Sequence, residues 1–183
     1  MCVNTSCQQA RGVLLLLLAV SGAKLPMAEL RALATDLGAT NVSTYIASGT
    51  LLCVPPGGPE EFDRLLERAI EAKFGYFREI ISRSPQELEL ALECDPFEVL
   101  DPSRSFVNFL LEAPAPQALA KAKTYPTGQD LWDVVGRDLH IRYWDGAGRS
   151  QLKDAAIRRV LGVLGTARNL GTVAKLLSLT RSP

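Results

Sequence analysis

The chain has 183 residues, of which 47% are hydrophobic and 22% are charged, and its acidic and basic residues balance to a formal net charge of zero. The length allows a buried core that needs no disulfide or metal, and the composition is that of an ordinary globular protein. The zero net charge favours neither a nucleic-acid binder nor a protein with an acidic tail.

The first feature along the chain is the apolar run Val13–Val20, which follows a short extension that we predict to be disordered. Arg11 before the run and Ser21-Gly22-Ala23 after it are also the parts of a secretory signal, and the run is too short to span a bilayer as a helix. A fully buried strand gives the same kind of run. Leucine richness favours the signal, whereas a helix that begins at Met27 favours the strand, so the residues alone leave both open.

Helix and strand signals alternate through the rest of the first half. Apolar residues at helical spacing predict two helices, and Ser84 followed by Glu87 predicts a capping box at the start of a third. Glycine and proline clusters separate these segments. The predicted elements are a helix over 27–37, a strand over 42–54 interrupted at Ser48-Gly49, a helix over 60–74, a strand over 76–82 and a helix over 84–94.

The second half follows a proline-containing linker over 95–104. Gly136-Arg137, between two strand patterns, predicts a two-residue hairpin turn of type II′. In the second hairpin strand, His140, Arg142 and Trp144 share one face, and the apolar residues between them share the other. The predicted elements are a strand over 106–111, a helix over 115–123, strands over 131–135 and 139–144, and helices over 150–161 and 172–179.

The order of these elements is β-α-β-α-β-α followed by β-α-β-β-α-(β)-α, where the strand in parentheses is optional. This order predicts the α+β class, with two α/β lobes that have mixed sheets on a ferredoxin-like, split β-α-β plan. We divide the chain into a disordered extension over 1–12, an N-terminal lobe over 13–98 and a C-terminal lobe over 99–183.

The cysteines and the single histidine suit no metal site. Cys2, Cys7, Cys53 and Cys94 form no CxxC pair, and His140 is the one histidine available to join them. We therefore expect no structural metal, no disulfide and no cofactor, and free thiols fit a reducing, cytoplasmic compartment. The sequence also lacks the GxxxxGK[ST], GxGxxG and GxSxG motifs, and we interpret His140 as a solvated strand residue rather than a general base.

Four segments of the chain are similar to those of a known family. They are KLPMAELR at 24–31, NVSTYIASG at 41–49, DGAGRS at 145–150, and GTARN at 165–169 followed by Thr172-Val173 and Lys175-Leu176. With these segments in this order and spacing, the chain resembles the domain-of-unknown-function family 1697 (DUF1697) over Leu14–Leu179. The resemblance implies a bacterial-type, cytoplasmic α+β protein with no established activity, cofactor or catalytic residue. It also favours the buried strand over the signal at the N-terminus.

The chain departs from the pattern of this family at three places. Leu17-Leu18-Ala19-Val20 stands where the family has a polar turn that ends the first strand. Thr50 stands where the family has asparagine, and Leu170-Gly171 stands where it has Trp-Asn. If those polar residues form a shared site in the family, this chain has lost part of it.

The C-terminal quarter of the chain is basic, since nine basic residues stand against three acidic ones from Arg137 to the end. Arg149-Ser150 and Arg168-Asn169 each place an arginine and a capping residue before a predicted helix, and such helix starts bind anions. The predicted anion-binding site consists of Arg149, Ser150, Lys153, Arg168, Asn169, Thr172 and Lys175. The alternative is a structural role, in which the capping residues only cap and the arginines pair with carboxylates.

These patterns favour a binding module for a small anion or a partner protein. The alternative function is an enzyme that acts on a phosphorylated or carboxylated metabolite, for which no positioned acid–base pair is visible in the sequence. Nucleic-acid binding is disfavoured because the basic quarter has few aromatic residues, and nothing indicates a membrane partner. An exposed apolar patch near the predicted site would favour a protein partner.

Overall fold

The structure is a computed structural model that describes residues 14–18, 25–45, 50–152 and 154–181, the first of these ranges as backbone. The predicted extension over 1–12 lies outside these residues. The chain forms two compact units, Met1–Glu89 with Leu176–Pro183, and Leu90–Lys175. The change of unit comes earlier than the boundary that we drew at residue 98. The end of the chain belongs to the first unit, where Arg181 pairs with Glu89 at 2.5 Å.

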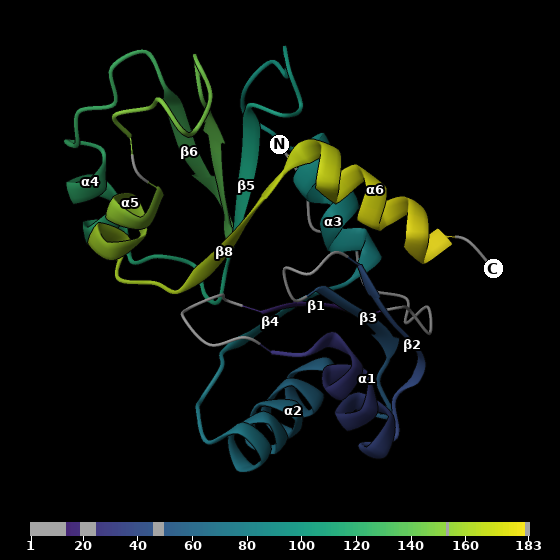
Figure 1. Cartoon of the computed structure of the whole chain (residues 1–183). Helices are drawn as coiled ribbons and strands as arrows, with labels where there is room; N and C mark the ends of the chain where they lie inside the picture. Colours follow the sequence, from purple (N-terminus) through teal and green to yellow (C-terminus); the bar gives the residue numbers. More distant parts are fainter. Residues whose placement is uncertain (1–13, 19–24, 46–49, 153, 182–183) are drawn as a thin grey trace. The chain divides into compact units, whose positions relative to one another are not determined.

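The first unit contains a four-stranded sheet in the order β2-β3-β1-β4, with α1 and α2 on one face (Figure 1). Every strand pair in it is antiparallel. Its elements, with the helix that leads out of it, are β1 Leu14–Leu18, α1 Met27–Asp36, β2 Thr40–Tyr45, β3 Thr50–Val54, α2 Pro59–Phe74, β4 Ile80–Arg83 and α3 Pro85–Glu93.

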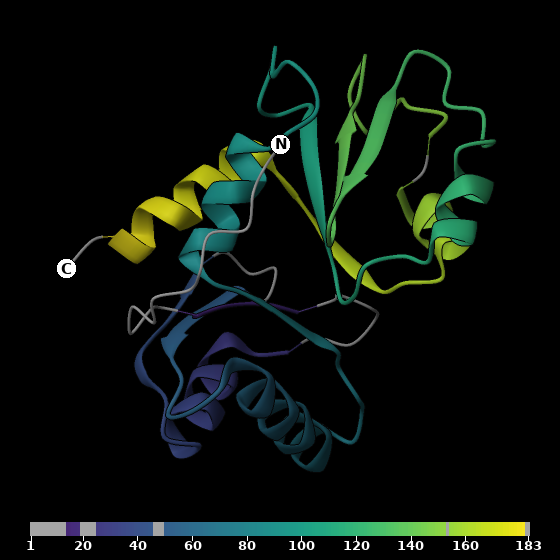
Figure 2. The ribbon, with the colours of Figure 1, turned by 180° about the vertical axis from the view of Figure 1, so that it is seen from behind.

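The second unit repeats this plan with the sheet order β6-β7-β5-β8, again with antiparallel pairs (Figure 2). The helices α4 and α5 lie side by side beside this sheet. Its elements, with the helix that closes the chain, are β5 Ser105–Leu110, α4 Pro116–Ala122, β6 Leu131–Val135, β7 Asp138–Arg142, α5 Asp154–Leu161, β8 Gly165–Asn169 and α6 Leu170–Arg181.

The predicted α+β class and the split β-α-β plan are confirmed, whereas the prediction of mixed sheets is wrong. In each unit the two strands joined by a helical crossover are not neighbours, because an antiparallel strand lies between them. β3 separates β1 from β2, and β7 separates β5 from β6. A crossover helix therefore does not require parallel neighbours in the sheet.

Leu14–Leu18 of the apolar run forms the strand β1, which is the alternative that the family resemblance favours. β1 lies between β3 and β4, and the backbone of Leu16 is opposite Leu51 on one side and Ser82 on the other. The predicted strand over 42–54 is instead two antiparallel strands, β2 and β3, since the Ser48-Gly49 interruption falls in the connection between them, outside the described residues.

The core of the first unit lies between its sheet and its two helices. Leu51 and Cys53 of β3 share one face of the sheet and pack with Leu30 of α1 and Phe62 of α2, all of them buried. The amphipathic face of α2 supplies these contacts, as its sequence predicts. Gly75 ends α2 because its left-handed φ of 73° costs glycine little.

The core of the second unit lies under α4 and α5. Leu139 and Ile141 of β7 pack with Ile157 and Leu161 of α5. The hairpin that presents β7 turns at Gly136, where φ is 61°, as the predicted type II′ turn requires. No helix in the described ranges is long and apolar enough to cross a membrane.

Candidate functional site

The first part of the predicted anion site is occupied by internal contacts. The Arg149 side chain is 77% exposed and pairs with Asp145, with 3.2 Å between Nη1 and Oδ2. The Ser150 hydroxyl donates to the buried carboxylate of Asp130. The prediction that Ser150 caps a helix is wrong, because α5 begins at Asp154. Lys153 lies outside the described residues.

The second part of the predicted site surrounds the junction of β8 and α6. The Nη1 atom of Arg168 donates to the Thr166 hydroxyl at 2.9 Å and to the carbonyl of Ala167 at 2.7 Å. Burial lowers the pKa of Arg168 from its usual value. The Asn169 side chain accepts the backbone N–H of Thr172 at 2.7 Å and so caps α6, which begins at Leu170. Lys175 is exposed on the same helix.

These residues fall into two groups. Ser150 is held by Asp130, which immediately precedes β6, whereas Arg168 lies in β8. β6 and β8 are the two opposite edges of the sheet, which three strand spacings separate by about 14 Å. The fold thus places Ser150 and Arg168 at opposite edges, while Arg168, Asn169 and Thr172 remain together.

His140 differs from its prediction as a solvated residue, because its side chain is fully buried. Its Nδ1 lies 3.4 Å from Oδ2 of Asp95, whose side chain is 7% exposed. Asp95 belongs to the segment that we predicted as a linker, and this segment covers the His140 face. A buried imidazole of this kind has no access for a substrate.

Exposed apolar residues lie on and near the end of the β6–β7 pair. Leu131 of β6 is opposite Arg142 of β7, so their side chains share a face. Trp144 follows two residues later with 57% of its surface exposed, while Tyr143 points into the core. Arg142 donates to the carbonyl of Glu98 at 3.2 Å, which places the next two residues beside this face.

We name this feature the Trp144 surface and define it by its four exposed apolar residues, Val99, Leu100, Leu131 and Trp144. Arg104 borders it, since its Nη1 donates to the carbonyl of Trp144 at 3.0 Å. The strand pattern predicted that Trp144 shares a face with Arg142, but β7 ends at Arg142, two residues before Trp144. Its exposure depends on the length of the neighbouring segments, and no local signal in the sequence gives it.

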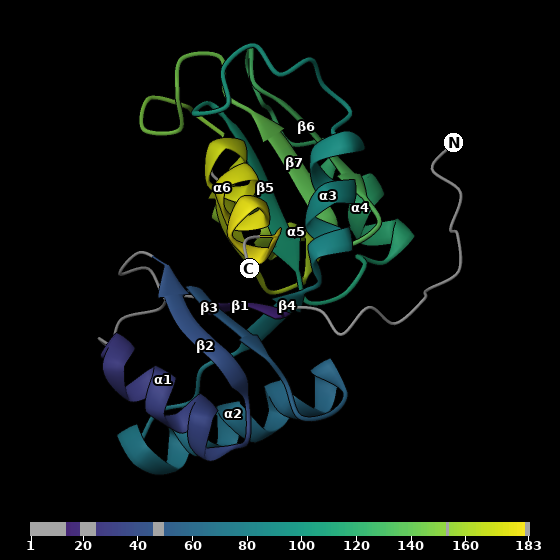
Figure 3. The same ribbon diagram turned by 90° about the vertical axis from the view of Figure 1, so that its right-hand side faces the viewer.

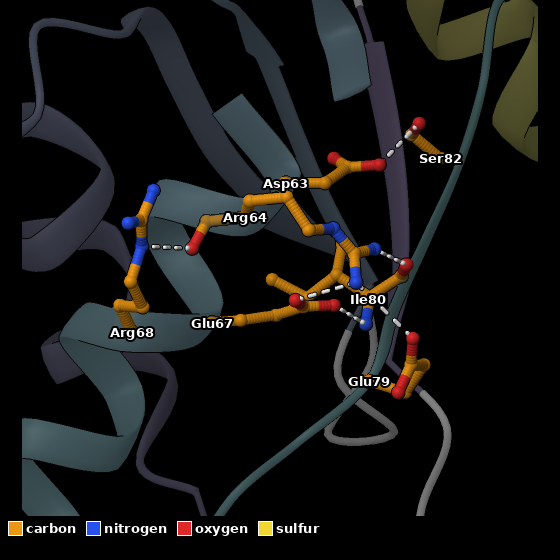
Figure 4. Close-up of polar contacts among 7 residues, drawn as sticks. All are labelled: Asp63, Arg64, Glu67, Arg68, Glu79, Ile80 and Ser82. Carbon is orange, nitrogen blue, oxygen red and sulfur yellow. Dashed lines mark hydrogen bonds and ion pairs between the residues drawn. The ribbon is translucent and has the colours of Figure 1, made fainter. Parts of the chain in front are cut away.

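A polar cluster of the first unit links α2 to β4 (Figure 4). Oδ2 of Asp63 accepts the Ser82 hydroxyl at 2.6 Å, while Oδ1 has no hydrogen-bond partner among the described residues. Glu67 accepts the backbone N–H of Ile80 at 2.9 Å and pairs with Arg64 at 2.7 Å. Burial raises the pKa of both carboxyls, that of Asp63 to about 6.

Cys53 lies near this cluster but is chemically quiet. Burial, with a smaller contribution from the charge of Asp63, raises the pKa of its thiol to about 12. The thiol is therefore protonated at neutral pH, and a protonated thiol is neither a nucleophile nor a metal ligand. Within the described ranges no cluster of potential ligand side chains is placed to hold a metal ion.

Asp63 should make stability depend on pH. Its pKa is higher in the folded chain than the ordinary 3.8, so the folded state binds its proton more tightly and stability falls as pH rises from about 4 through 6. The shift corresponds to about 3 kcal/mol at 1.36 kcal/mol per unit. Asp63→Asn, which cannot ionise, should be more stable than wild type at pH 8 and should lack this part of the pH dependence.

Denaturant unfolding of both proteins between pH 4 and pH 8 measures this effect. The matched control is Glu61→Gln on the exposed side of α2, which should leave the pH dependence unchanged. Equal stability changes for wild type and Asp63→Asn across this range would show that the Asp63 carboxyl ionises at its ordinary pKa.

The comparisons with known proteins agree with the fold. The structure of the conserved bacterial protein SP0830 from Streptococcus pneumoniae matches with a TM-score of 0.70 and 18% sequence identity, over 93% of this chain and 99% of that one. No curated protein matches the chain. The model of the family described as "Protein of unknown function (DUF1697)" matches residues 12–140, which confirms the resemblance seen in the sequence. The chain belongs to the DUF1697 family.

Proposed function

We propose that this protein is a binding module for a partner protein and that the Trp144 surface is its binding site. The observation that carries the proposal is the exposure of Trp144, at 57%, and of Leu100, at 67%, in two segments that hydrogen bonds of Arg104 and Arg142 join. Tryptophan and arginine are enriched at the centres of protein interfaces, and apolar residues gathered on one exposed surface mark interaction sites. Arg104 and Arg142 supply the polar border.

The contacts of the arginines favour a protein over a small anion as the ligand. Arg149 already pairs with Asp145, and Arg168 donates to its own strand. An anion at either place would have to replace these contacts. A smaller anion site at Arg168, Asn169, Thr172 and Lys175 is a secondary proposal, and phosphate-dependent stabilisation that is lost in Lys175→Ala would support it.

The alternative of an enzyme acting on a phosphorylated or carboxylated metabolite finds less support. Such an enzyme needs an accessible acid or base. The acid and the base described above, Asp63 and His140, are both buried. We further propose a cytoplasmic location, because the free thiol of Cys53 fits a reducing compartment.

Site-specific photo-crosslinking tests the proposed function. Trp144 is replaced by the photoreactive amino acid p-benzoylphenylalanine in the cells that make the protein, and adducts are identified by mass spectrometry. We expect one discrete adduct with a single protein. The control places the same group at Phe77, an aromatic residue of the first unit with a similar exposure of 53%. The same set of adducts from both positions, or none from position 144, would contradict the proposal.

A further inference from the structure

Each open sheet of this protein has two edge strands, and an edge strand offers unpaired N–H and C=O groups to another chain. The edges are β2 and β4 in the first unit and β6 and β8 in the second. Among the described residues, charged side chains contact the outward backbone groups of β4, β6 and β8 but not those of β2.

The edge of β4 is covered by the polar cluster of α2. The outward N–H of Ile80 donates to Glu67 at 2.9 Å, and its carbonyl accepts Arg64 at 3.4 Å. The next outward carbonyl, that of Ser82, accepts Nη1 of Arg83 at 2.9 Å. Figure 4 shows the α2 side chains reaching this edge. A pairing strand would have to displace these charged groups.

The edge of β6 has a cover of the same kind. Lys123, which follows α4, donates to the carbonyl of Trp132 at 3.3 Å. Asp133 accepts the N–H of Val134 at 2.8 Å. Asp133 also pairs with Lys123 at 2.7 Å. Lys123 also lies over the Trp132 ring, 4.4 Å from its centroid, which holds the cover in place.

The edge of β8 is covered by two arginines. Arg158 of α5 donates to the carbonyl of Gly165 at 2.8 Å. Arg168 donates to the carbonyl of Ala167 at 2.7 Å. Gly165 and Ala167 alternate along β8, so both carbonyls point away from β5. Arg168, predicted from the sequence to bind an anion, therefore has a structural contact at a sheet edge.

β2 lacks such a cover within the part of the chain that the structure describes. The strand reads Thr-Asn-Val-Ser-Thr-Tyr over 40–45, with no charged residue and no proline, and Thr40, Asn41 and Ser43 are exposed. The charged side chain of Arg31 contacts β2, but it donates to the Thr44 hydroxyl at 2.7 Å and not to the backbone. Figure 3 shows β2 at the border of its sheet.

We infer that β2 is an interaction edge and that its partner is the β2 strand of a second copy of this chain. Two antiparallel copies of one strand are related by a two-fold axis, so the strand must tolerate itself as a neighbour. β2 meets this condition, because it has no charge to repel its copy and its serine and threonine hydroxyls can pair across strands. The register shift between Thr40 and Ser43 confines regular pairing to Ser43–Tyr45.

This inference does not depend on the proposed function, because β2 belongs to the first unit and the Trp144 surface to the second. Short pairing predicts a dimer that forms with rising protein concentration. Sedimentation velocity of the full chain at increasing concentration should show this dimer. Ser43→Lys should remain monomeric, because a lysine on an edge strand opposes pairing with another strand. Gln129→Lys, an equal charge change on an exposed loop of the second unit, should dimerise like wild type.

A wild-type protein that is monomeric at every concentration would overturn the inference and leave β2 to an extended segment of another protein. A dimer that persists in Ser43→Lys would overturn it in favour of another surface. The covers can be tested in the Ser43→Lys protein by adding Lys123→Ala and Asp133→Ala. We expect this protein to associate through the uncovered β6, and a monomer would show that the covers do not direct pairing to β2.

Discussion

Leu16→Pro should leave the first unit unfolded. Leu16 lies in the middle of β1, which pairs with β3 on one side and β4 on the other. Proline has no N–H to give to either neighbour and is found in sheets on edge strands, not on inner ones. The substitution therefore removes a ladder hydrogen bond and strains both pairings, which costs about 3 kcal/mol or more by analogy with helix interiors.

Hydrogen exchange of the full chain measures this loss residue by residue. Backbone amides of β3 and β4 should exchange rapidly in Leu16→Pro at a temperature where they are protected in wild type. The control is Leu16→Ile, which keeps the N–H and the number of side-chain carbons and should retain protection. Native protection of β3 and β4 in the proline variant would show that β1 is not an inner strand of this sheet.

Phe62→Ala should produce the largest loss among single side-chain truncations in α2. Phe62 is 1% exposed and packs with Leu30 and Leu51 at the centre of the first core. Truncation of a buried phenylalanine removes its transfer free energy and leaves a cavity, and together these cost about 3–5 kcal/mol. A loss of this size is a large share of the stability of an ordinary domain.

Leu65→Ala is the matched control, because Leu65 lies on the same helix with 36% of its surface exposed. It should cost well under half as much as Phe62→Ala in denaturant unfolding of the full chain. Similar losses for the two variants would mean that the apolar face of α2 is not packed as the structure has it.

The local patterns of the sequence were sufficient for most of the elements. The capping box at Ser84 is present, with the Ser84 N–H donating to Glu87 at 2.7 Å, since both partners are three residues apart. The type II′ hairpin at Gly136 needs only two residues. The start of α5 was misplaced because Ser150 has a competing long-range partner in Asp130, twenty residues away along the chain.

The candidate site was harder to predict because it depends on which elements become neighbours. Helix starts with arginines predicted one anion site, but the order of the strands puts β6 and β8 at opposite edges. The burial of His140 depends on Asp95, which is far from it in the chain. Charged covers on sheet edges have no local pattern in the sequence, since Lys123 and Asp133 meet only in the folded second unit.

The Trp144 surface as a partner-binding site is tested most directly by a second substitution in the crosslinking experiment. Leu100→Glu places a charge on this surface beside the photoreactive group at position 144, and Leu164→Glu places one on a leucine outside it that is 53% exposed. Both variants should fold, because both leucines are exposed. If a partner binds the surface, the adduct from position 144 should be lost in Leu100→Glu and retained in Leu164→Glu. An adduct of undiminished yield in Leu100→Glu would contradict the proposed binding site.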